Sequence, residues 1–250
     1  MDQMDDENNL GPIVDEIIGK NKKKRASVDP IADEVFGRNK ERRPTMVFTK
    51  GGLTPLKTMI EEAGNDYHHT KQPEYKKIGR FFKAKSFKVV YADITWNYRV
   101  MSDYVKEFTT KYKFNPKDDN YFLGFSFGAV ISFLASVKLK PKLQILCSLS
   151  GVFKEDMEKA SPEFTKLAYK YCRKRRMKDL EKFAFNKIYS KVKSKSIILL
   201  GDSEHKEMLR RCKDANKKLK GSKLIIVPNN DHNIRKKEYL AAIEKVVSKL

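Results

Sequence analysis

From Thr45 to the C-terminus, short apolar segments alternate with amphipathic ones, and this alternation constrains the fold more than any other feature of the sequence. The apolar segments are continuous and rich in β-branched residues, as the central strands of a parallel sheet are. The segments between them have helical periodicity. The pattern predicts an α/β fold with a mainly parallel central sheet and helices on both faces. The predicted strands are residues 46–49, 87–92, 121–124, 143–148, 196–200 and 223–227.

Three of the helical segments support more specific predictions. Residues 102–112 predict a helix capped by Ser102 or Asp103. Residues 129–135 are apolar almost throughout, which predicts a buried helix. The C-terminal segment is expected to place four apolar side chains on one face, namely Leu240, Ile243, Val247 and Leu250.

Residues 153–195 interrupt the alternation, because they contain no strand-like run and are helical in pattern. They carry 14 Lys/Arg against 6 Asp/Glu. We interpret them as a basic helical cap inserted between two strands. Its charge fits a solvated lid, a surface that guides an acidic acyl substrate or a membrane, or a nucleic-acid patch. Aromatic residues lie among the bases, and this spacing favours the apolar underside of a cap over a base-stacking surface: Tyr169, Tyr171, Phe183, Phe185 and Tyr189.

Residues 1–43 differ from the domain predicted at 44–250. They lack a sustained apolar period, which predicts a mostly disordered tail. Within the tail, residues 12–25 recur as 30–43, with the proline, isoleucine, Asp-Glu pair, glycine and basic end in register. Each copy resembles one short capped helix, which is marginal alone in water. The repeat therefore predicts a linear motif that folds on a protein partner. The alternative is a duplicated tail without function.

The positive charge belongs to the body of the chain. The formal net charge is +21, whereas residues 1–43 hold 9 basic and 10 acidic side chains. Such a balance suggests an anionic partner, either nucleic acid, an anionic surface or an acidic substrate. A lysine-rich surface kept for solubility is the alternative. The sequence contains no recognisable DNA-binding or RNA-binding motif.

Residues 124–128, Gly-Phe-Ser-Phe-Gly, have the form G-x-S-x-G. A predicted strand precedes them and a predicted helix follows at once. A sharp turn from strand to helix projects a serine hydroxyl away from the backbone, and the flanking glycines let the turn close. The start of the helix also favours a developing oxyanion. Ser126 is therefore the candidate nucleophile.

A serine nucleophile needs a base and an acid that orients the base. His232 is the one histidine that directly follows the last predicted strand. Asp202 and Glu204 follow the strand before it, so the chain order is serine, acid, histidine. All three elements fall at the carboxyl ends of strands, where ligands bind in open α/β sheets.

On these motifs, residues 44–250 resemble the α/β-hydrolase superfamily. The resemblance implies an eight-strand-type sheet, a nucleophile elbow and a helical cap. In that superfamily the acid usually stands three residues after a glycine, a position that Glu204 holds relative to Gly201; Asp202 remains the alternative. The resemblance also implies an oxyanion hole from the N–H groups of Phe127 and Gly52. Lys50 replaces the histidine usual in that motif, a departure that itself suggests attraction of an anionic substrate.

Several other classes of protein are disfavoured. Three widely spaced cysteines, Cys147, Cys172 and Cys212, argue against a disulfide scaffold or a zinc site. The adjacent His68 and His69 lack a matching ligand cluster. No apolar run approaches the roughly 20 residues of a membrane span, and the acidic N-terminus does not resemble a secretory signal. We expect a soluble, cytoplasmic protein of a reducing compartment, without metal or organic cofactor.

The sequence thus predicts a serine hydrolase that cleaves an ester, thioester or amide of a small acyl substrate. Ser126 would attack, His232 would move the proton, and Glu204 or Asp202 would hold His232. The alternative is a hydrolase-fold scaffold with weak or no catalysis. Such a scaffold would bind a partner through the repeated tail and an anion through its basic body.

Overall fold

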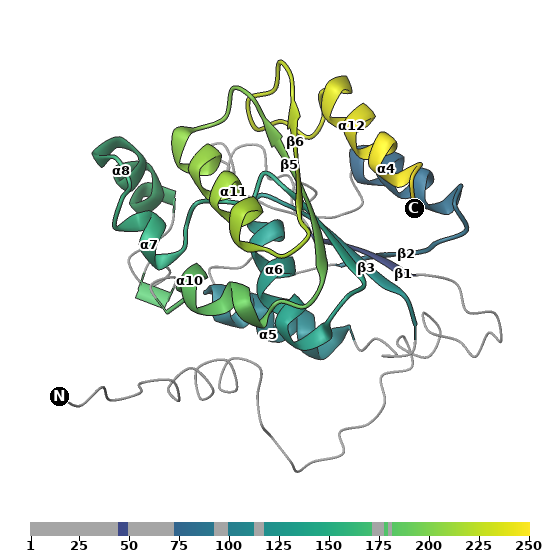
Figure 1. Cartoon of the computed structure of the whole chain (residues 1–250), viewed down its shortest axis with the longest axis horizontal. Coiled ribbons are helices and arrows are strands. Elements are labelled where there is room, and N and C mark those ends of the chain that lie inside the picture. Colours follow the sequence, from purple (N-terminus) through teal and green to yellow (C-terminus); the bar gives the residue numbers. More distant parts are fainter. Residues whose placement is uncertain (1–44, 50–72, 93–99, 113–117, 172–177, 180–181) are drawn as a thin grey trace, which may run out of the picture.

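The computed structural model describes residues 45–49, 73–92, 100–112, 118–171, 178–179 and 182–250 (Figure 1). The tail 1–43 with both copies of its motif lies outside these residues. So do four residues named above: Lys50, Gly52, His68 and His69. The same holds for Cys172 and the basic residues that follow it.

The core of the described chain is a six-stranded sheet in the order β2-β1-β3-β4-β5-β6, and all five strand pairings are parallel. This confirms the predicted α/β class. The eight-strand-type sheet implied by the resemblance is larger than the six strands that the described residues form. The strands are β1 (Thr45–Thr49), β2 (Lys88–Tyr91), β3 (Asn120–Phe125), β4 (Leu143–Cys147), β5 (Lys195–Gly201) and β6 (Lys223–Val227).

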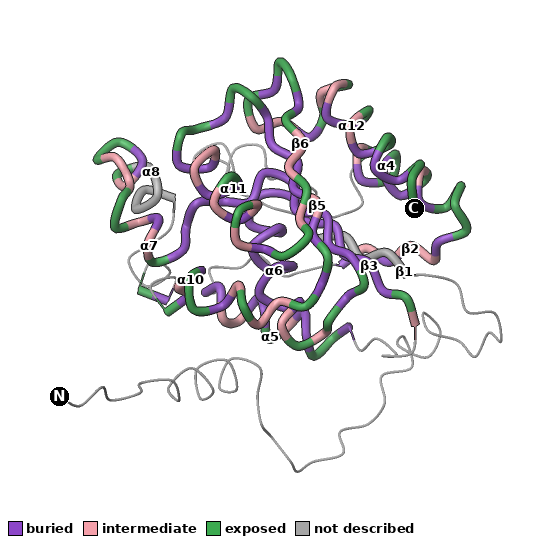
Figure 2. The backbone as a smooth tube through the Cα atoms, in the orientation of Figure 1, coloured by how far each residue is buried: buried purple, intermediate pink, exposed green. Residues whose placement is uncertain are grey.

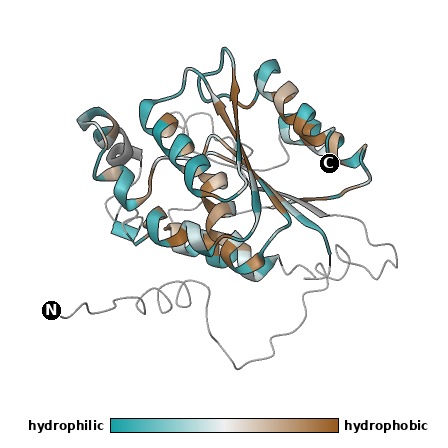
Figure 3. Cartoon of the chain, viewed as in Figure 1, coloured by the Kyte–Doolittle hydropathy of each residue, from teal (hydrophilic) through white to brown (hydrophobic). Residues whose placement is uncertain are grey.

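Helices cover both faces of the sheet, as predicted (Figure 1). On one face, α4 (Pro73–Lys83) and α12 (Lys237–Val247) pack together and share an apolar cluster with the strands. On the other face lie α5 (Met101–Lys111), α6 (Phe127–Leu139) and α11 (Lys206–Lys218). The helices are hydrophobic toward the sheet and hydrophilic away from it (Figure 3). The sides of the helices that face the sheet are buried and their outer sides are exposed. The interior of the sheet and helix α6 are the most deeply buried parts (Figure 2).

The ends of the helices differ in detail from the sequence prediction. Helix α5 is capped at Val100, whose N–H donates to the Asp103 carboxylate at 3.2 Å. Ser102 lies inside the first turn and donates to Asp179 instead. Leu250 was expected on the apolar face of the last helix but is 40% exposed, because α12 ends at Val247.

The regular structure between β4 and β5 that is described is helical, as expected of an insertion. They form α7 (Lys154–Met157), α8 (Pro162–Tyr171), α10 (Phe185–Ile188) and the 3-10 turn η1 (Tyr189–Lys191). Phe183 and Phe185 are buried beneath them, which agrees with the apolar-underside interpretation. Tyr189 is partly buried. The side chains of Tyr169 and Tyr171 lie outside the description.

Arg211 of α11 anchors this insertion to the body. It is 2% exposed, and its Nε and Nη2 donate to the Asp156 carboxylate of α7 at 2.7 and 2.6 Å. Its guanidinium also lies 4.1 Å from the centre of the Phe185 ring. A buried charge is tolerated only when it is paired and hydrogen-bonded. The contact therefore fixes α7 and α10 against α11.

In the part of the chain that the structure describes, no helix is long and apolar enough to cross a membrane.

Candidate active site

Ser126 occupies a strained turn between β3 and α6. Its φ and ψ are 56° and −119°, a region that side-chain-bearing residues rarely adopt. Strand β3 ends at Phe125 and α6 begins at Phe127, so one residue makes the whole turn. The Ser126 N–H donates to Cys147 O at 2.9 Å, which pins the turn to β4. This is the geometry that the G-x-S-x-G motif predicts.

His232 lies between Ser126 and Glu204. Its Nε2 is 3.0 Å from Ser126 Oγ and its Nδ1 is 2.9 Å from Glu204 Oε2. The His232 side chain is 30% exposed, whereas that of Glu204 is fully buried. The imidazole also lies 4.8 Å from the Phe125 ring, centre to centre. Three loops from different strand ends thus bring a hydroxyl, an imidazole and a carboxylate into one line of hydrogen bonds.

The Glu204 carboxylate is held by donors on its other oxygen. Glu204 Oε1 accepts from the Gly201 N–H at 3.0 Å and from Ser148 Oγ at 2.5 Å. Ser148 Oγ also lies 2.8 Å from the hydroxyl of Tyr239, which contacts Leu199 O at 3.0 Å. Burial raises the pKa of Tyr239 well above its usual value, so its hydroxyl stays protonated as a donor. This network leaves Oε2 directed at His232.

Asp202 faces away from the imidazole. Its carboxylate accepts from the N–H groups of Asn230 and Asn229 at 3.1 and 3.0 Å. These bonds, with one from Ser203 Oγ, lower the pKa of Asp202 below its usual range. The structure therefore brings Glu204, and not Asp202, to His232. Asp202 instead ties the loop after β5 to the loop that carries His232.

The histidine loop has further internal support. Asn230 is buried, its Nδ2 donates to Asn233 O at 2.9 Å, and its Oδ1 accepts from the Asn233 N–H at 3.1 Å. A Cβ added at Gly201 would lie 2.2 Å from Asn230 O. Position 201 therefore needs a glycine, because the two loops approach too closely for any side chain.

Ser150 is a neighbour of the nucleophile that the sequence did not reveal. Its Oγ lies 3.2 Å from Ser126 Oγ, and both residues are 1% exposed. Ser148, Ser150, Tyr239 and Asn230 belong to no recognisable motif. The one available signal was that Ser148 ends the predicted strand before the cap and Ser150 closely follows it, at the same edge of the sheet as Ser126.

The predicted oxyanion hole is described only in part. Phe127 is the first residue of α6, so its N–H belongs to the helix start, where backbone donors lack helical partners. Gly52, the other predicted donor, lies outside the described residues.

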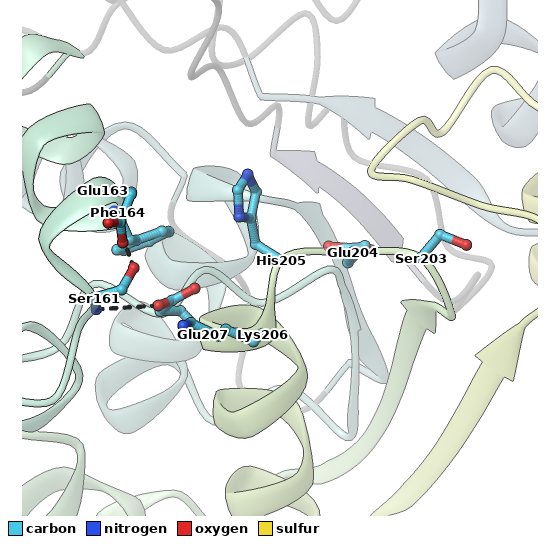
Figure 4. Close-up of a pocket in the computed structure, with 8 residues that line it drawn as sticks. All are labelled: Ser161, Glu163, Phe164, Ser203, Glu204, His205, Lys206 and Glu207. Atoms are coloured by element: carbon cyan, nitrogen blue, oxygen red, sulfur yellow. Dashed lines mark hydrogen bonds between the residues drawn. The ribbon is translucent and has the colours of Figure 1, made fainter.

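A pocket of about 460 Å³ adjoins the acid loop (Figure 4). It lies between the start of α8 and the loop from β5 to α11. Glu204 is one of the residues that line it, whereas Ser126 and His232 are not. Glu207 Oε1 accepts from the Ser161 N–H at 3.2 Å, while its buried Oε2 has no hydrogen-bond partner in the described part of the chain. The residues that line the pocket are Ser161, Glu163, Phe164, Ser203, Glu204, His205, Lys206 and Glu207.

Two other chemistries can be compared with the structure. Within the described ranges, no group of three His, Cys, Asp or Glu side chains is placed to hold a metal ion. Cys147 and Cys212 are buried free thiols, and burial raises the pKa of both well above the usual value. Cys212 thus lacks the thiolate character of a reactive cysteine, although bases surround it in the sequence.

The comparisons with known proteins concern the fold. No family model matches the sequence, and no curated protein matches it. Many solved structures do match, and their titles include several α/β hydrolases and esterases. With the parallel sheet and the elbow, they show that this chain has the α/β-hydrolase fold.

Three of these structures show how similar the fold is and how low the sequence identity is. Est1E from Butyrivibrio proteoclasticus has a TM-score of 0.64 and 15% identity, covering 84% of this chain and 88% of its own. Alpha/beta hydrolase domain-containing protein 10 from mouse has a TM-score of 0.60 and 11% identity, covering 82% and 88%. A putative hydrolase from Agrobacterium vitis has a TM-score of 0.60 and 11% identity, covering 83% and 87%.

Proposed function

We propose that the protein is a serine hydrolase that cleaves an ester, thioester or amide through Ser126, His232 and Glu204. The observation that carries the proposal is the line of hydrogen bonds from Glu204 Oε2 through both His232 nitrogens to Ser126 Oγ. The strained elbow at Ser126 supports it independently, because backbone strain is retained mainly where function needs it.

The geometry supports a two-stage reaction. Ser126 Oγ attacks the carbonyl carbon and its proton passes to His232 Nε2. The Nδ1–H of His232 donates to Glu204, which stabilises the imidazolium. The tetrahedral intermediate expels the leaving group, which takes the proton from Nε2. Water then attacks the acyl-serine and loses its proton to His232. The second tetrahedral intermediate collapses, His232 returns the proton to Ser126 Oγ, and the free acid leaves.

The negative charge that develops on the substrate's carbonyl oxygen during attack needs hydrogen-bond donors close to Ser126. The Phe127 N–H at the start of α6 is one, and we assign the Gly52 N–H as the second. Loss of one such donor typically costs about 10²–10³-fold in kcat. Since Est1E has been solved with ferulic acid bound, aromatic acyl esters belong in a first substrate panel.

Labelling by a fluorophosphonate probe tests the proposal. The probe should label the wild-type protein, while Ser126→Ala and His232→Ala should lose labelling, with each variant's folding checked by its thermal melt. Absence of labelling in folded wild-type protein would overturn the proposal. The hydrolase-fold scaffold would then be the better account.

A further inference from the structure

Lysines are concentrated just before the strands. Four windows of six residues, each ending on the first residue of a strand, contain three lysines apiece. The windows are 83–88 before β2, 138–143 before β4, 190–195 before β5 and 218–223 before β6. Their sequences are KAKSFK, KLKPKL, SKVKSK and KLKGSK.

General lysine richness does not account for this concentration. Lys and Arg together make up 53 of 250 residues, so 24 positions should hold about five of them by composition alone, yet they hold twelve. The opposite ends of the strands show the reverse. The four residues after each of β3, β4, β5 and β6 include no Lys or Arg, but they include Asp202, Glu204 and Asp231.

The topology gathers these lysines on one edge of the sheet. All strands are parallel, so every strand start lies on the same edge. Strands β4, β5 and β6 are neighbours and contribute nine lysines, while β2 adds three at the far end of the sheet. At about 4.8 Å per strand, the row from β2 to β6 is roughly 24 Å long. We call this set the lysine edge: Lys83, Lys85, Lys88, Lys138, Lys140, Lys142, Lys191, Lys193, Lys195, Lys218, Lys220 and Lys223.

These side chains face solvent. All twelve residues are exposed or partly exposed, while the apolar residues between them, such as Phe87 and Leu219, are buried. Asp119 pairs with Lys142 and Asp214 pairs with Lys218. Lys140 even occupies a left-handed backbone position, with φ 45°, where glycine or asparagine is usual. The edge therefore presents a row of positive charge with little apolar surface.

The lysine edge cannot serve the hydrolytic site directly. Ser126, Glu204 and His232 follow the carboxyl ends of strands, on the opposite edge of the sheet. Strands of four to seven residues separate the two edges by roughly 13 to 23 Å at about 3.3 Å per residue. A charge placed there does not guide a small acyl substrate to Ser126. An anion that binds the lysine edge is therefore a different one.

We infer that the lysine edge binds the phosphate backbone of a nucleic acid without sequence preference. A linear row of charges suits a linear polyanion. Lysine acts as a point charge toward phosphate, and the four windows described above contain no arginine and no exposed aromatic side chain that could read or stack bases. A membrane surface is the weaker fit, because apolar insertion normally supplements charge. The exposed large apolar side chains of the described residues are Ile226 and Leu250, and one such side chain adds at most about 2 kcal/mol.

The test is fluorescence anisotropy with labelled single-stranded RNA and duplex DNA, each about 20 units long and of mixed sequence, titrated with the full chain over a range of salt. Affinity should fall steeply with salt and should not depend on sequence. The edge variant carries six Lys→Gln changes, at Lys138, Lys140, Lys142, Lys191, Lys193 and Lys195. The control carries the same number at exposed lysines outside the lysine edge, namely Lys76, Lys77, Lys106, Lys159, Lys166 and Lys237.

The edge variant should weaken binding at least tenfold and reduce the magnitude of the log–log salt slope by roughly four to five if all six lysines contact phosphate, since each lost phosphate contact contributes about 0.7 to 0.9. The control should change affinity less than threefold. Equal weakening in both variants would show that net charge alone acts and would overturn the inference. Wild-type binding to phosphatidylserine vesicles but to neither nucleic acid would also overturn it. Fluorophosphonate labelling of the edge variant tests the hydrolase separately and should be unchanged.

Discussion

Ser148 Oγ donates a 2.5 Å hydrogen bond to Glu204 Oε1, so the end of β4 positions a carboxylate that follows β5. The backbone supports this arrangement, because Ser148 holds a φ of 52° that directs its side chain into the site. With Oε1 occupied by Ser148 and by the Gly201 N–H, the other oxygen is left for His232. The orientation of the imidazole thus depends on residues that never contact a substrate.

Ser148→Ala should lower kcat by roughly 10- to 100-fold, the range typical of groups that orient a functional side chain through a hydrogen bond. KM should stay nearly constant, because Ser148 acts through Glu204. Steady-state kinetics on a chromogenic ester provides the measurement. Ser203→Ala is the matched control, since Ser203 Oγ contacts only the exposed Asp202. Similar losses in the two variants would argue against the positioning role.

Substitution of the two candidate acids should separate their roles. Glu204→Gln should reduce kcat by about 10²–10⁴-fold, because an amide no longer stabilises the imidazolium or selects the tautomer. Asp202→Asn should cost less than tenfold, since Asp202 binds the backbone of Asn229 and Asn230 and not His232. Rates of fluorophosphonate labelling compare both variants without a known substrate. A larger loss in Asp202→Asn would reverse the assignment.

The sequence predicted what depends on periodicity and chain order. The six strands, the buried helix after Ser126, and the placement of Ser126 and His232 at strand ends all follow from local patterns. The choice between Asp202 and Glu204 did not follow, because both come within three residues of Gly201 and only hydrogen bonds from other loops separate them. Ser150 and Tyr239 were missed for the same reason: their partners are distant in the chain. The cap of α5 at Val100 depends on Asp103 acting from inside the helix, which single-residue cap preferences do not capture.

Gly201→Ala should impair both stability and activity. The added methyl would lie 2.2 Å from Asn230 O, a backbone atom that cannot move aside without shifting the histidine loop. We expect a loss of roughly 1–3 kcal/mol in the free energy of unfolding, as for other overpacked sites. We also expect slower labelling of Ser126, because His232 would be displaced. Urea unfolding and probe labelling measure the two effects.

Gly221→Ala is a contrasting control, since no atom lies within 4 Å of a Cβ there and only its φ of 68° opposes the change. Unimpaired labelling in Gly201→Ala would show that the loop relaxes freely.

Ser150→Ala should slow acylation modestly. If the Ser150 hydroxyl donates to Ser126 Oγ, it stabilises that oxygen as charge develops during attack. One neutral hydrogen bond is worth about 1 kcal/mol, which corresponds to roughly a fivefold change in rate. The second-order rate constant for fluorophosphonate labelling is the readout, with the thermal melt as a check on folding. An unchanged rate constant would mean that the two hydroxyls merely pack together.

Arg211→Met should destabilise the protein most at neutral pH. Burial raises the pKa of Asp156, while the hydrogen bonds and charge of Arg211 oppose that rise. Without Arg211, Asp156 would be an unpaired buried carboxylate beside Glu155 and Asp214, a loss of about 3–5 kcal/mol in the free energy of unfolding. The folded state would then bind the Asp156 proton more tightly than the unfolded state does. The stability deficit should therefore grow as pH rises from the usual aspartate pKa through the raised value, and shrink as pH falls.

Urea midpoints across pH measure this dependence. Adding Asp156→Asn to Arg211→Met should recover part of the loss at neutral pH. A stability deficit that changes neither with pH nor on addition of Asp156→Asn would refute the account.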